Sequence, residues 1–131
     1  MSENFVFEII TPDGSIIKTE ASEVTVPCYE GQIGILKDHI PLITFLRPGL
    51  IILEQDKKKY YVEEGTVEFK NNLLVIPTTN AKDLSSIDKD FINKHLQDSE
   101  KKLETENVDD KEKYLLNQKI DTLKEIREKI A

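Results

Sequence analysis

The chain has 131 residues, a net charge of −7 at pH 7 and 38% hydrophobic against 33% charged residues. This length suits one compact domain, or a small domain with an appendage. The acidic balance argues against nucleic-acid binding, which needs clustered Lys and Arg, and a single cysteine, Cys28, excludes an internal disulfide. The most apolar stretch, residues 40–53, is broken by Arg, Pro and Gly and is shorter than the roughly 20 residues of a membrane span. We therefore expect any membrane association to be indirect.

Glycine and proline divide the chain into two parts of different character. All five glycines and all five prolines lie before residue 78. Both residues punctuate turns between strands and are disfavoured inside helices. We therefore predict an α+β fold, with an N-terminal antiparallel β-sandwich over residues 1–84 and a C-terminal two-helix hairpin over residues 85–131.

Short runs rich in β-branched and aromatic residues predict the strands of the first part. In chain order these runs are residues 5–10, 15–19, 23–26, 32–36, 50–53, 60–63, 67–70 and 73–77. Strands at this spacing are typical of an antiparallel sandwich or barrel. Residues 12–14 and Asn71-Asn72 predict tight turns, and the basic run at residues 57–59 indicates a solvated hairpin turn more than an anion-binding patch.

The first helix is predicted to start near Ser85, which has capping-box spacing with Asp88. One face of the helix then carries residues spaced three to four apart, as expected of a stripe that packs against other parts of a fold. The members of this stripe are Ile87, Phe91, His95 or Leu96, and Leu103.

The second helix follows a bend at residues 105–109, where apolar periodicity is absent and Asn107 or Asp109 could supply a cap. Its predicted stripe consists of Leu116, Ile120, Leu123 and Ile130, widened by Leu115 and Ile126. Because isolated helices of this length are marginal in water, the stripes must pack on each other or on another surface. A two-helix cap on the sandwich and a mobile arm both fit the pattern.

Few residues are suited to catalysis. The chain has two histidines, His39 and His95, and no phosphate-binding loop, Cys-x-x-Cys pair or nucleophile elbow. Asp38-His39 is the only candidate acid–base dyad, and Cys28 reads as an inert packing residue more than a reactive thiol. We therefore predict no catalytic residues, no metal ligands and no cofactor.

The segment from residue 30 to residue 53 resembles the epsilon subunit family of F-type ATP synthases, homologous to mitochondrial delta. Three spaced elements carry the resemblance: Glu-Gly-x-hydrophobic-Gly at residues 30–34, His-x-Pro-hydrophobic at residues 39–42, and Pro-Gly-hydrophobic at residues 48–50. The opening strand, residues 61–65 and the two-helix tail also fit the family.

The resemblance implies a non-catalytic rotor subunit of the central stalk, which couples proton flow to ATP synthesis by linking gamma to the c-ring. It implies interface residues at Glu30, Gln32, Asp38 and His39, with Gln32 and His39 on loops that face the c-ring. Many members have an acidic residue where this chain has Gln32. For His39, a role in bracing the turn beside Pro41 remains an alternative.

The resemblance also implies that the helices can extend toward the alpha and beta subunits and restrain ATP hydrolysis. The expected location is the cytoplasmic face of the bacterial inner membrane. Some members bind ATP through an Ile/Leu-Asp-x-x-Arg-Ala motif, of which this chain keeps Ile87 and Asp88 but lacks Arg-Ala, so we predict weak or no nucleotide binding. The competing functions are a free-standing protein-binding adaptor and, last, an enzyme built on Asp38-His39.

Overall fold

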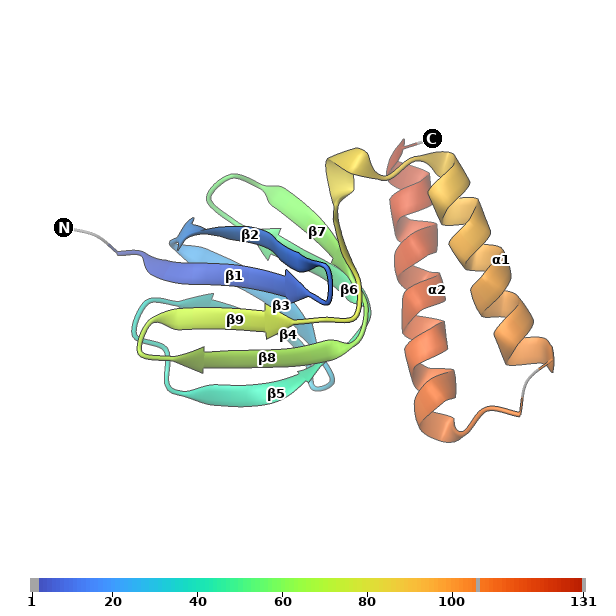
Figure 1. Ribbon diagram of the computed structural model, residues 1–131, viewed down its shortest axis with the longest axis horizontal. Helices are drawn as coiled ribbons and strands as arrows, with labels where there is room; N and C mark the ends of the chain where they lie inside the picture. The colour runs from blue at the N-terminus through green and yellow to red at the C-terminus, as the bar shows by residue number, and fades with distance from the viewer. Residues whose placement is uncertain (1–2, 106, 131) are drawn as a thin grey trace. The chain divides into compact units, whose positions relative to one another are not determined.

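The computed structural model describes residues 3–105 and 107–130. These residues form two compact units that divide between Leu84 and Ser85 (Figure 1). The first unit consists of strands and the second of helices, so the predicted fold class is confirmed.

The described residues form ten strands, eight of which correspond to the predicted runs. Their bounds are β1 Phe5–Thr11, β2 Gly14–Ala21, β3 Glu23–Cys28, β4 Gly31–Leu36, β5 Leu42–Leu46, β6 Gly49–Leu53, β7 Lys58–Val62, β8 Gly65–Lys70, β9 Leu73–Pro77 and β10 Ala81–Asp83. The prediction omitted β5 and β10. In β5 apolar residues occupy the exposed positions as well as the buried one, so the strand shows no polar–apolar alternation. β10 has only three residues, too few to show a period.

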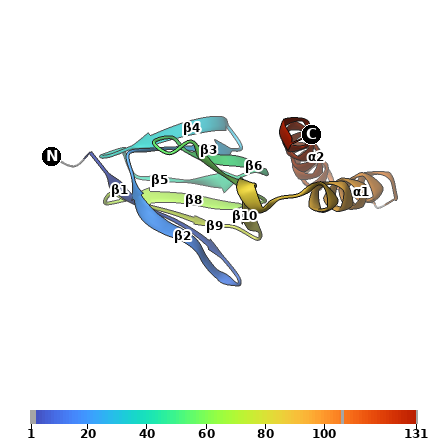
Figure 2. The same ribbon diagram turned by 90° about the horizontal axis from the view of Figure 1, so that it is seen from above.

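The strands pair into two layers that share one junction. One layer has the order β10-β7-β6-β3-β4 and the other the order β5-β8-β9-β1-β2, and they join where Cys28 pairs with Leu46. Figure 2 shows β4, β3 and β6 in one layer and β1, β2 and β9 in the other. The pairings are antiparallel except that β1 runs parallel to β9.

Alternate side chains of the strands fill the space between the layers. Burial alternates along β1, as expected for a strand with one face on the core. Phe5 and Phe69 meet edge to face, with ring centroids 5.6 Å apart, which is a favoured aromatic geometry. Other fully buried members of this core are Phe7, Ile9, Val24, Val26, Ile35, Leu46, Ile51, Val67, Leu74 and Ile76.

Two of the predicted turns are confirmed by their backbone geometry. Asn71 and Asn72, between β8 and β9, have φ values of 53° and 57°. A two-residue hairpin with positive φ at both positions has the twist that antiparallel strands need, and Asn tolerates this conformation. Gly14, at the turn between β1 and β2, has a φ of 123° that side chains rarely adopt.

Helix α1 spans Lys89–Thr105 and follows a 3₁₀ turn, η1, at Leu84–Ser86. The Phe91 N–H donates to the Asp88 carboxylate at 2.8 Å, so Asp88 caps the helix. The prediction that the helix starts near Ser85 is therefore wrong, because the 3₁₀ turn delays the first α-helical turn until after Asp88.

The buried side chains at and before α1 match the prediction only in part. Ile92, Leu96 and Ser99 are buried in the helix, whereas Phe91 and His95 are half-buried and stack on each other with centroids 4.1 Å apart. Ile87 and Leu96 are thus buried as predicted, whereas Ile92 is buried in place of Phe91. Helix α1 packs against α2.

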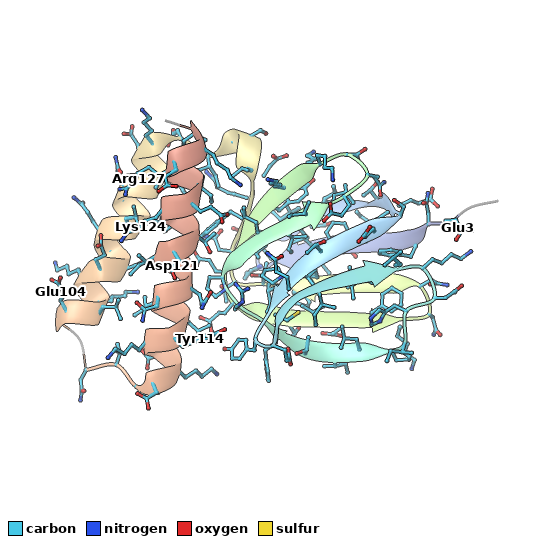
Figure 3. All side chains as sticks on the ribbon, turned by 180° about the vertical axis from the view of Figure 1, so that it is seen from behind. Glu3, Glu104, Tyr114, Asp121, Lys124 and Arg127 are labelled. Carbon is cyan, nitrogen blue, oxygen red and sulfur yellow. The ribbon has the colours of Figure 1, made fainter. Side chains whose placement is uncertain are left out.

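Helix α2 spans Asp110–Ile130. Its first turn is capped by Asp109, whose carboxylate accepts from the Glu112 N–H at 2.8 Å. Of the two predicted caps, Asn107 and Asp109, the structure therefore has Asp109. Ile120, Thr122, Leu123 and Ile126 are buried, whereas Ile130 is exposed, contrary to the prediction. Asp121, Lys124 and Arg127 are exposed charged residues of the same helix (Figure 3).

Ser99 is a weak point of the hairpin. Its side chain is buried, and its hydroxyl has no hydrogen-bond partner among the described residues. Because an unsatisfied buried hydroxyl is destabilising and Ala favours helix more than Ser, Ser99→Ala should stabilise the hairpin by about 1 kcal/mol. Slower amide hydrogen exchange in α1 of the full chain would show this gain. The exposed Asn93→Ala controls for helix propensity alone, and a Ser99→Ala variant that gains no more than this control would contradict the prediction.

Candidate functional site

Strand β5 presents apolar side chains to solvent at the edge of its layer. It pairs with β8 along its whole length, but its other edge meets β3 only at Cys28. Ile43 and Phe45 on this strand are 82% and 60% exposed, and Ile40, just before the strand, is 74% exposed. These are the three most exposed large apolar side chains of the described residues, and we call them the β5 strip.

A shallow groove lies beside the β5 strip. It has a volume of about 500 Å³ and is lined by Pro41, Leu42, Ile43, Glu68, Phe69, Lys70, Leu73 and Val75. Ile43 belongs to both features, so strip and groove form one continuous, mostly apolar surface over β5, β8 and β9. An exposed apolar surface rimmed by polar residues is typical of a protein interaction site.

The turn that carries Glu30 is fixed to the C-terminal end of β5. The Thr44 hydroxyl lies 2.9 Å from both carboxylate oxygens of Glu30 and donates to them. The Tyr29 N–H donates to the Phe45 carbonyl at 3.1 Å, and the two rings lie 5.7 Å apart. Gln32 follows as an exposed residue of β4.

The loop that carries Asp38 and His39, residues 37–41, leads into the N-terminal end of β5. The His39 ring lies edge-on to the Phe69 ring at 5.8 Å, and its Nδ1–H donates to the Ile40 carbonyl at 2.7 Å. Asp38 has a φ of 66° and is hydrogen-bonded to Asn72. This half-buried histidine thus helps to brace the loop next to the exposed Ile40.

The four predicted interface residues do not meet at one point. Glu30 and Gln32 lie at the start of β4, whereas Asp38 and His39 follow its end. Gln32 and Asp38 are six positions apart along the chain, mostly within β4, which corresponds to about 20 Å at the usual rise per strand residue. Strand β5 runs back between the same two ends, so the β5 strip lies between the two polar pairs. The predicted list missed the strip itself.

The residues considered for catalysis have other partners. The Asp38 carboxylate accepts from Asn72, and His39 donates to a main-chain carbonyl, so the structure does not join them as a dyad. Cys28 is buried; burial, with a smaller effect of Glu30, raises its thiol pKa to about 11, while Arg47 partly opposes the shift. Such a thiol stays protonated at neutral pH and is a poor nucleophile.

Residues 3–105 and 107–130 lack both the side-chain clusters of a metal site and the kind of helix that spans a membrane. This part of the chain contains no cluster of three or more His, Cys, Asp or Glu side chains that could hold a metal ion. Neither of its helices is long and apolar enough to cross a membrane.

Comparison with known proteins identifies the family. Residues 4–83 match the family described as the beta-sandwich domain of the ATP synthase Delta/Epsilon chain. The ATP synthase epsilon chain of Pelagibacter ubique (strain HTCC1062) is 46% identical over 127 residues, which cover 95% of this chain and 98% of the relative. The chain belongs to the ATP synthase delta/epsilon family. This confirms the predicted family and the predicted function as an ATP synthase epsilon chain.

The chain also resembles a further relative and a solved structure. The chloroplastic ATP synthase epsilon chain of Pyropia yezoensis is 36% identical over 114 residues, 86% of this chain and 84% of the relative. A chain in the structure of the Euglena gracilis mitochondrial ATP synthase, solved as OSCP/F1/c-ring, matches with a TM-score of 0.74 at 18% identity. That match covers 100% of this chain and 84% of the Euglena chain, and it shows that the two chains share a fold.

The two residues kept from the family's nucleotide motif have structural roles here. Ile87 is buried, and the Asp88 carboxylate caps α1. The weak or absent nucleotide binding of this family member stays a prediction.

Proposed function

We propose that the chain is a non-catalytic subunit of the rotating central stalk, which links gamma to the c-ring and so couples proton flow to ATP synthesis. The β5 strip is the observation that carries this proposal. Burial lowers the free energy of apolar side chains that are exposed to water, and here these side chains are Ile40, Ile43 and Phe45. The strip is therefore stabilised when another surface covers it. Asp38 is hydrogen-bonded to Asn72 and His39 to a main-chain carbonyl, so they do not form an acid–base pair, which supports a role without catalysis.

The β5 strip and its groove form the centre of the proposed contact with gamma. Glu30, Gln32, Asp38 and His39 form a polar rim around it, and an apolar centre within a polar rim is the usual anatomy of a protein interface. Gln32 and His39 contact the polar loops of the c-ring from the two ends of β4.

Co-purification tests this function. The tagged full chain should recover gamma and the c-ring from solubilised membranes of its own organism, and it should be present in the purified synthase. A free-standing adaptor would use the same strip to bind an unrelated protein. Recovery of another protein without any synthase subunit would overturn the proposal in favour of the adaptor.

The proposed location is the cytoplasmic face of a bacterial inner membrane, where the chain is held through the complex. The similarity to the Pelagibacter ubique epsilon chain supports a bacterial synthase. Membrane fractions should therefore retain the chain only while the synthase subunits that bind it are present.

We further propose that the helical hairpin restrains ATP hydrolysis by reaching the alpha and beta subunits. A switch of this kind needs two packings that differ by only a few kcal/mol. The narrow stripes of α1 and α2 and the unsatisfied Ser99 hydroxyl support such a small difference, because they limit how strongly the helices hold each other.

Removal of residues 85–131 should therefore raise ATP hydrolysis by the assembled synthase at least twofold. The measurement compares complexes that carry the full or the shortened chain, with subunit content and ATP synthesis as controls. Equal hydrolysis rates in complexes of equal composition would show that the hairpin is not inhibitory.

A further inference from the structure

Asn72 joins three separate parts of the sandwich. Its side-chain oxygen accepts from the Asp38 N–H at 2.7 Å, and its side-chain amide donates to the Asp38 carboxylate at 3.0 Å. Its main-chain carbonyl accepts from the N–H of Val6 on β1 at 3.0 Å. The loop at residues 37–41 is thus tied, by a two-point contact, to a turn 34 residues further along the chain.

The contact fastens the loop at a residue with an uncommon backbone conformation. Asp38 has a φ of 66°, in the left-handed region that a non-glycine residue adopts only at some cost. The next two residues are His39, which is braced against Phe69, and Ile40, which is 74% exposed. A free loop that carries an exposed isoleucine could lower its free energy by folding this side chain against the nearby groove.

We infer that Asn72 is a positioning residue for the docking surface, because its two hydrogen bonds to Asp38 hold Ile40 and His39 in a binding-ready arrangement. This inference rests on the proposed docking to gamma. Asp38 holds the loop through its two hydrogen bonds to Asn72 and not through its charge. Ordering a loop before binding removes a conformational cost from association.

The test uses the full chain and the purified gamma–c-ring subcomplex of the same synthase. Asn72→Gly removes both side-chain hydrogen bonds while glycine still accepts the positive φ. We expect its Kd for the subcomplex to rise about tenfold, with a slower association rate, which is the size of effect that loss of a preorganising contact can produce. Amide exchange at Asp38 should be at least tenfold faster in the free chain.

Two control variants separate positioning from stability and from charge. Asn71→Gly makes the same substitution at the neighbouring turn residue, which has a φ of 53° and takes no part in the contact with Asp38, so it should bind like the wild type. Asp38→Asn keeps an acceptor oxygen and the main-chain N–H but removes the charge, so amide exchange at residue 38 should stay as slow as in the wild type.

The outcomes distinguish this inference from the proposed function. If the wild-type chain does not bind the subcomplex, the docking proposal itself is contradicted. The positioning role is overturned if the wild type binds but Asn72→Gly and Asn71→Gly have the same affinity and the same amide exchange rate at Asp38. Exchange at residue 38 that is at least tenfold faster in Asp38→Asn would show that the charge, and not the two hydrogen bonds, holds the loop, which also overturns it.

Discussion

Replacement of Ile43 by aspartate should weaken binding to the gamma–c-ring subcomplex by about 100-fold, equivalent to roughly 3 kcal/mol, while the chain stays folded. In the free chain Ile43 is 82% exposed, so the substitution removes little packing. In the proposed complex the carboxylate would be buried against an apolar surface without a partner, and such burial is costly. Titration of the full-length variant against the purified subcomplex measures the loss.

Ile16→Asp is the matched control for this experiment. Ile16 lies on β2, at the opposite edge of the same layer, and is 40% exposed. It receives the same change in size and charge, yet it lies outside the β5 strip, so its Kd should stay within about twofold of wild type. Equal losses in the two variants, or no loss in Ile43→Asp, would remove the β5 strip from the interface.

The sequence was a good guide to elements that follow local rules. Asn71 and Asn72 indicated a turn because both tolerate the positive φ that a tight hairpin needs. The confinement of Gly and Pro to the first part of the chain separated strands from helices. Local spacing could not choose between adjacent helix faces, however, because Ser99 interrupts the apolar pattern of the buried stripe that begins with Ile92.

The docking surface was predictable only in part. The resemblance supplied Glu30, Gln32, Asp38 and His39, but it could not show that β4 separates them into two pairs. The β5 strip escaped notice because an exposed isoleucine and a buried one are identical in a sequence. The contact between Asp38 and Asn72 joins residues 34 positions apart and depends on how two turns meet in space.

Gly65 is the position where a single methyl group should cost the most stability. It begins β8, pairs with Leu46 of β5 and bridges to Thr78. A Cβ at Gly65 would contact the Pro77 carbonyl oxygen and would lie 2.8 Å from the Thr78 Cα. Both are main-chain atoms, so no side-chain rotation can relieve the overlap.

Gly65→Ala should therefore lower the free energy of unfolding by about 3 kcal/mol or more, because relief of the overlap requires the strands to move apart. The buried Thr78, whose hydroxyl lies 2.9 Å from the Glu64 carbonyl, would lose its position in the same movement. Urea denaturation of the full chain, followed by the signal of the sandwich, measures the change.

Gly34→Ala provides the comparison for Gly65→Ala, since both place alanine in a strand of the sandwich. At Gly34 the nearest atom to an added Cβ is a Glu23 carboxylate oxygen at 3.5 Å, an ordinary contact, so its stability should change by less than about 1 kcal/mol. Because Gly65 pairs directly with Leu46 at the end of β5, the displacement should also disturb the β5 strip and weaken docking. Equal stabilities for the two variants would mean that the strands near Gly65 yield more easily than their main-chain contacts imply.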